Sequence, residues 1–125
     1  MVIAIIAILA AIVLINVTQY INKAKDARIK SDLSNMMTGM ATCYADKGTY
    51  VGCAANATYV PATIATDITA QGGLLVNTND ANATGSYCAS SKEVANAAMN
   101  ICVDSTGVTK EATTATCVVA VTACP

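Results

Sequence analysis

The residues of this chain best suited to covalent chemistry are its cysteines, which number six in 125 residues. All six follow a strongly apolar N-terminal segment, no C-x-x-C motif is present, and the chain contains no histidine. A zinc site usually draws on such motifs or on histidine, whereas an even number of cysteines in a small body is typical of disulfides in an exported protein. We therefore predict disulfides and no metal site. The cysteines are Cys43, Cys53, Cys88, Cys102, Cys117 and Cys124.

The pairing of these cysteines is open at the level of sequence, because six cysteines permit fifteen pairings. We expect neighbours along the chain to pair, which would tie a helix end to the following loop, join two strands and close a C-terminal loop. Each such bond typically contributes about 2–4 kcal/mol to stability. Free buried thiols in a reducing compartment are the alternative. The expected bonds are Cys43–Cys53, Cys88–Cys102 and Cys117–Cys124.

The composition argues against an enzyme. Histidine, the commonest general base, is absent, and no phosphate-binding loop or nucleophile–base pair can be found. Charged residues make up 12% of the chain, against roughly 25% in ordinary globular domains. The formal net charge of −1 provides no electrostatic attraction for nucleic acid. We predict a non-enzymatic protein that needs no cofactor and does not bind nucleic acid.

The N-terminal end is an unbroken apolar run. Residues 1–15 read MVIAIIAILAAIVLI, without one polar side chain. A membrane-spanning helix needs about 20 apolar residues, so the run is slightly short. A signal peptide would place basic residues ahead of the run, and a buried globular helix of this kind would need apolar partners on every side. We favour a membrane helix that lacks its first turns, or one that also packs in an assembly.

A helical period follows the apolar run. Apolar residues recur at three- and four-residue steps, which marks one apolar face. The sequence Asp46-Lys47-Gly48 then provides a stop, with glycine where a left-handed cap would lie, and no proline interrupts residues 1–46. We predict one continuous helix over these residues, about 69 Å long at 1.5 Å per residue. Its apolar face consists of Ile29, Leu33, Met36, Met37, Met40 and Tyr44.

The rest of the chain is predicted to form strands and loops, with a short helical turn near residues 61–68. Two of the strands should form a hairpin around Ser105-Thr106-Gly107, whose glycine suits positive φ. The expected fold class is α+β, with a long N-terminal helix packed against a small antiparallel, β-rich, disulfide-bonded head. The expected strands cover residues 86–90, 100–104 and 108–111, with 116–122 as a last strand or a packed loop.

This organisation divides the chain into three parts. Residues 1–22 form the apolar half of the helix, residues 23–47 form its amphipathic half, which packs on the head, and residues 48–125 form the head with its C-terminal disulfide loop.

The segment VIAIIAILAAI at residues 2–12 resembles the N-terminal helix of type IV pilins and of their pseudopilin relatives. The continuation NKAKDARIKSDL at residues 22–33 and the helix end YADKGTY at residues 44–50 are similar to the same family. The hairpin sequence CVDSTG at residues 102–107, followed by a cysteine-bounded loop, matches the family in layout only.

The resemblance implies a major pilin, a structural subunit held in the inner membrane and then polymerised into a helical filament on the cell surface. It also implies an assembly platform driven by a cytoplasmic ATPase and a prepilin peptidase as partners, and roles in adhesion, twitching motility or DNA uptake. The alternatives are a pseudopilin of a type II secretion system, which forms a short periplasmic filament, and a monomeric membrane-anchored binding protein.

The sequence departs from the family pattern at its start. Family precursors carry a short basic leader ending in glycine, and a glutamate follows the cleavage site, but no residue here corresponds to either. The sequence opens about seven residues into the mature pattern, and restoring them would bring the apolar run to spanning length. Ile15 and Asn16 stand where many family members carry a proline.

Within a filament, the N-terminal helices would associate by close packing. Lipid tails are as apolar as the helices that leave them, so burial alone gains little. Small residues let helix backbones approach, and Ala7-x-x-x-Ala11 fits the small-xxx-small pattern. The expected packing residues are Ala4, Ala7, Ile8, Ala11 and Ile12.

Overall fold

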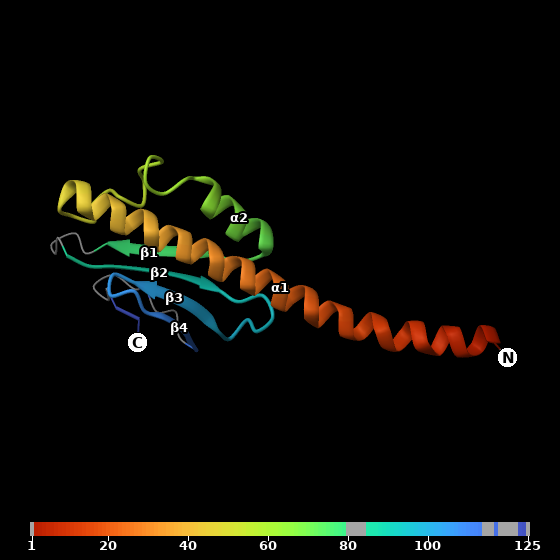
Figure 1. Ribbon diagram of the computed structural model, residues 1–125. Helices are drawn as coiled ribbons and strands as arrows, with labels where there is room; N and C mark the ends of the chain where they lie inside the picture. The colour runs from red at the N-terminus through yellow and green to blue at the C-terminus, as the bar shows by residue number, and fades with distance from the viewer. Residues whose placement is uncertain (1, 80–84, 114–116, 118–122, 125) are drawn as a thin grey trace.

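A computed structural model describes residues 2–79, 85–113, 117 and 123–124. Figure 1 shows a long helical rod whose N-terminal half projects from a small head, while its C-terminal half lies against the sheet. This is the α+β layout predicted from the sequence. The elements are α1 (Val2–Lys47), α2 (Thr63–Gln71), β1 (Leu75–Asn79), β2 (Tyr87–Lys92), β3 (Asn100–Asp104) and β4 (Thr109–Ala112).

The continuous N-terminal helix is confirmed, because α1 runs for 46 residues without a break. It ends where Gly48 adopts a φ of +69°, a left-handed conformation that glycine takes without steric cost. Tyr44, predicted on the apolar face, is 38% exposed and stacks on the ring of Tyr50 at 4.6 Å between centroids. Met37, also predicted there, is only partly buried. The face that is fully buried consists of Ile29, Leu33, Met36, Met40 and Cys43.

The head contains a four-stranded antiparallel sheet in the order β1-β2-β3-β4. The predicted hairpin is confirmed as β3 and β4, and Gly107 in its turn has a φ of +82°. The strand predicted at residues 86–90 is β2, and the predicted helical turn is α2, displaced toward the C-terminus. Strand β1 was not predicted. Of the segment expected at residues 116–122, all but Cys117 lies outside the described residues.

The two faces of the sheet pack into two different buried clusters. Tyr87 and Ala89 on β2, with Ile101 and Val103 on β3, pack with the buried face of α1. The alternating residues Cys88 and Cys102 belong to a second buried cluster with Cys117 and Cys124. Because successive side chains of a strand point to opposite faces, the sheet separates a helical layer from a layer formed by C-terminal cysteines.

Candidate functional site

The N-terminal half of α1 is uncovered. Every side chain over residues 2–13 is exposed, and the exposed fraction is 84% for Ile3 and 55% for Ile12. Helix α1, of which this segment is the first part, is long and apolar enough to cross a membrane, as an anchor or a signal sequence would. Exposed apolar patches larger than a few hundred Å² normally mark a membrane or protein contact, so this half of the rod is the first candidate site.

The packing residues predicted from the sequence form one stripe on this rod. Their spacing of three, four, seven and eight residues from Ala4 places them on a common helical face. All five are exposed in the isolated chain: Ala4, Ala7, Ile8, Ala11 and Ile12. A shallow apolar groove on another face of the same segment is lined by Ile6, Leu9, Ala10 and Val13.

Polar contacts attach the head to α1 at a defined position along the helix. The carboxylate of Asp26 on α1 accepts hydrogen bonds from the backbone N–H groups of Val94 (2.6 Å) and Ala95 (3.0 Å), in the loop between β2 and β3. One turn further along, Lys30 forms an ion pair of 3.2 Å with Glu111 on β4. That pair is half-exposed and adds at most about 1 kcal/mol. The bidentate contact of Asp26 therefore fixes where the rod leaves the head.

The opposite end of α1 is held by aromatic contacts. The ring of Tyr50 lies between those of Tyr44 and Tyr87, at centroid distances of 4.6 Å and 4.8 Å. Tyr87 is buried, and desolvation, with a smaller effect of Tyr50, raises the pKa of its hydroxyl well above the ordinary value. The hydroxyl has no hydrogen-bond partner in the described part of the chain. This cluster joins the helix end, the following loop and the sheet.

All six cysteines form disulfides, and the predicted Cys43–Cys53 bond is confirmed. The other two predicted pairings, Cys88–Cys102 and Cys117–Cys124, are wrong. Cys88 on β2 lies opposite Asp104, and Cys102 on β3 lies opposite Ser90, so the two cysteines are diagonal neighbours. Cys117 and Cys124 pack on this face of the sheet, and each bonds to a different strand. The observed bonds are Cys88–Cys117 and Cys102–Cys124.

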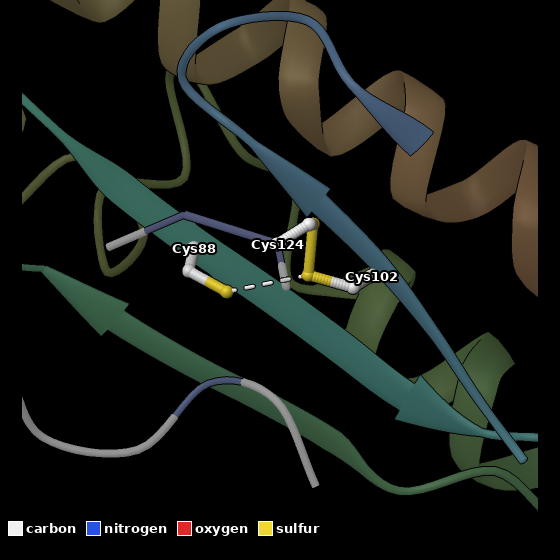
Figure 2. Close-up of side chains that lie close together, drawn as sticks. All are labelled: Cys88, Cys102 and Cys124. Carbon is white, nitrogen blue, oxygen red and sulfur yellow. Dashed lines mark hydrogen bonds between the residues drawn. A yellow bond between two sulfur atoms is a disulfide. The ribbon is translucent and has the colours of Figure 1, made fainter. Parts of the chain in front are cut away.

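These two disulfides form a single sulfur cluster. The Sγ atoms of Cys88 and Cys102 lie 3.4 Å apart, and those of Cys102 and Cys117 lie 4.0 Å apart. Figure 2 shows Cys88 and Cys102 on adjacent strands with Cys124 beside them. All four residues are buried. The sequence did not predict this cluster. Its sulfur contacts and disulfides join cysteines that are 14 to 29 residues apart along the chain.

A buried carboxylate supports the sulfur cluster. Asp104, which is 2% exposed, accepts hydrogen bonds from the N–H and hydroxyl of Thr106 and from the N–H groups of Val108 (3.4 Å) and Cys124 (2.9 Å). Burial alone would raise the pKa of this carboxyl, but the hydrogen bonds outweigh burial and hold the pKa below its usual value. Only its place at the start of a turn, Asp-Ser-Thr-Gly, signalled this role in the sequence.

Comparison with known proteins finds no matching family model, curated protein or solved structure. The residues and geometry described above define an α+β protein with an apolar projecting helix and a small head held by three disulfides.

Proposed function

We propose that this protein is a major pilin, a structural subunit that polymerises into a type IV pilus filament. The observation that carries the proposal is the uncovered apolar half of α1. Burial of apolar surface is favourable by about 25 cal/mol per Å², and the head covers none of residues 2–13. Such a surface is stable only in lipid or against other apolar helices.

The stripe of small residues favours helices as the final partners. Ala4, Ala7 and Ala11 alternate with larger apolar side chains along one exposed face. A plain anchor needs about 20 apolar residues and no particular pattern of side-chain size, whereas close approach of two helix backbones needs small residues at the contact. Every copy supplies such a helix, and a contact that repeats head to tail from copy to copy without closing generates a helical filament.

The disulfide-bonded head favours a location outside the cytoplasm. Disulfides persist in the periplasm and at cell surfaces and are rare in the cytosol. We infer that the subunit is held in the inner membrane by α1 before assembly and that the head is displayed on a cell-surface filament afterwards. A pilus assembly platform and a prepilin peptidase are the partners that this pathway requires. Adhesion, twitching motility and DNA uptake are the roles that such a filament serves.

The deciding experiment is assembly of the full chain. We expect protein purified in detergent to form long fibres, visible by electron microscopy, when the detergent is removed. Head residues should lie on the fibre surface and residues 2–13 in its core, as judged by protection of the helix from proteolysis. Protein that enters lipid vesicles but stays monomeric in cross-linking would refute the filament and establish a simple membrane anchor.

Experiments in cells would distinguish a pilin from a pseudopilin. Long surface fibres containing this chain are expected for a pilin. Short periplasmic filaments, together with loss of protein export on deletion of the gene, would instead assign the chain to a secretion system.

A further inference from the structure

We propose that the head, when its thiols are reduced, binds one soft metal ion such as Zn²⁺ through four thiolates. The ligands are Cys88, Cys102, Cys117 and Cys124. This inference is independent of filament formation. The sequence predicted no metal site because it lacks C-x-x-C motifs and histidine, but the fold gathers four cysteines that are remote in sequence.

The spacing of the sulfur atoms fits a tetrahedral site. A Zn–S bond of about 2.3 Å places the sulfurs of a tetrahedral site about 3.8 Å apart. The unbonded sulfurs of Cys88 and Cys102 are separated by 3.4 Å, and those of Cys102 and Cys117 by 4.0 Å. The sulfurs of Cys88, Cys102 and Cys124 all lie within 4.8 Å of one another. The proposal requires that, once the two disulfides open, rotation of the side chains brings the four sulfurs to this spacing.

The fold positions most of these ligands without help from the disulfides. Cys88 and Cys102 lie on the paired strands β2 and β3, whose register is set by backbone hydrogen bonds. Cys124 is held by the hydrogen bond from its N–H to Asp104. Three of the four ligands therefore have a non-covalent support in addition to their disulfide, and Cys117 completes the set from the same buried cluster.

The donor set selects the metal. Thiolates favour soft or borderline ions such as Zn²⁺, Cd²⁺ and Cu⁺ over Mg²⁺ and Ca²⁺. The nearby carboxylate of Asp104 already accepts hydrogen bonds from Thr106, Val108 and Cys124, so the proposed ligand set consists of sulfur alone. Four thiolates around Zn²⁺ leave a site charge of −2, which is common for structural sites of this type.

The two states of the cluster exclude one another. Reduction of the two disulfides by a dithiol or a phosphine takes up four electrons and four protons and yields four thiols. Binding of Zn²⁺ then releases four protons, because only the thiolate is a ligand. Oxidation back to two disulfides by a small disulfide such as oxidised glutathione transfers four electrons from the thiolates to that oxidant and releases the metal. The ion and the disulfides thus hold the same strands and C-terminal residues together under reducing and oxidising conditions, respectively.

The test uses the full chain in detergent, reduced and handled without oxygen, with Co²⁺ as a spectroscopic probe for Zn²⁺. We expect one Co²⁺ per chain, with the intense visible bands of tetrahedral cobalt and an ultraviolet sulfur-to-cobalt charge-transfer band. Zn²⁺ should displace the cobalt, and the oxidised chain should give no bands. Cys102→Ser should weaken binding by more than the roughly 10–100-fold that loss of an outer-shell contact costs.

The matched control is the Cys43→Ser, Cys53→Ser double variant, which removes the disulfide that lies in the other core. It should keep both the stoichiometry and the spectrum. The proposal is overturned if reduced wild-type chain shows no tetrahedral cobalt, or if Cys102→Ser binds as tightly as wild type. Equal affinity in guanidinium would overturn it too, because the fold would then contribute nothing to the site.

Discussion

The carboxylate of Asp104, at the end of β3, accepts a hydrogen bond of 2.9 Å from the backbone N–H of Cys124, which lies 20 residues further along the chain. Two residues before Asp104, Cys102 is bonded to Cys124 through sulfur. The end of the chain is thus attached to one strand by two different links, one covalent and one electrostatic. A buried carboxylate with several N–H and O–H donors is held in its charged form, which makes this link sensitive to mutation and to pH.

Replacement of Asp104 by asparagine should destabilise the head. The change removes the charge from four hydrogen bonds and directs amide hydrogens toward some of the donors. Hydrogen bonds to charged groups contribute about 1.5–3 kcal/mol each, and we expect a total loss of about 2–4 kcal/mol. Guanidinium unfolding of the full chain in detergent measures it. Asp67→Asn, at an exposed site on α2, should change stability by less than about 0.5 kcal/mol.

The contribution of Asp104 should also fall as the solution becomes acidic. Its pKa in the folded head lies below the ordinary value, so the unfolded chain takes up the proton first as the pH drops below about 4. The stabilisation is therefore complete above that pH and disappears as the pH falls through the folded-state pKa. The stability difference between wild type and Asp104→Asn should shrink between pH 7 and pH values near 3. A difference that stays constant with pH would contradict this account.

Asp32 should behave in the opposite way. Burial and the nearby charge of Asp67 raise its pKa, while Arg28 lowers it in part, and its Oδ2 atom is buried without a hydrogen-bond partner in the described part of the chain. A raised pKa means that the charged form costs stability above about pH 4. Asp32→Asn should stabilise the head at pH 7 by up to about 1 kcal/mol after allowance for solvent screening. The gain should vanish near pH 3, where both chains are neutral at this position.

Local sequence signals predicted the elements whose structure is locally determined. Helix α1 was predicted from the regular spacing of its apolar residues and from Gly48, where the helix ends. The β3–β4 hairpin was predicted from Gly107 in its turn. Strand β1, with the sequence LVNTN, carries no such signal. It exists because Leu75 to Asn79 pair with β2, a contact that depends on how the whole head folds.

The two remaining disulfide pairings and the role of Asp104 depend on tertiary contacts that local sequence patterns do not reveal. Pairing of sequence neighbours assumed that Cys88 and Cys102 face one another, but the register of β2 and β3 places them diagonally. The N–H of Cys124 reaches Asp104 only because the end of the chain returns to the sheet. The even number of cysteines predicted disulfides, and the tertiary structure determined which cysteines of this cluster are bonded.

Gly39 should resist replacement by alanine although it lies within a helix. Alanine is favoured over glycine in helices by about 1 kcal/mol, so an ordinary site would gain stability. A Cβ at Gly39, however, would clash with the backbone carbonyl oxygen of Tyr59, and α1 would have to move from the loop that follows Cys53. We expect Gly39→Ala to destabilise the head by about 1–3 kcal/mol. Ser34→Ala, at an exposed position of the same helix, should leave stability unchanged or raise it slightly.

Filament assembly should be more sensitive to residue size at Ala7 than at Ala10. Both alanines are exposed on the projecting half of α1, but only Ala7 belongs to the stripe that we propose as the contact between copies. Ala10 lines the groove with Ile6 and Leu9 on another face. Leucine at either position preserves apolar character, so insertion into membranes should be normal in both variants.

Ala7→Leu should lower the yield of fibres several-fold because the larger side chain keeps the helix backbones apart, whereas Ala10→Leu should assemble nearly as wild type. Sedimented fibre mass after detergent removal measures the yield, and flotation with lipid vesicles measures insertion. If both variants assemble equally well, the stripe is not the contact, although a filament built on another face would remain consistent with the uncovered rod. If both fail to assemble while still entering vesicles, the packing extends around the helix rather than along one face.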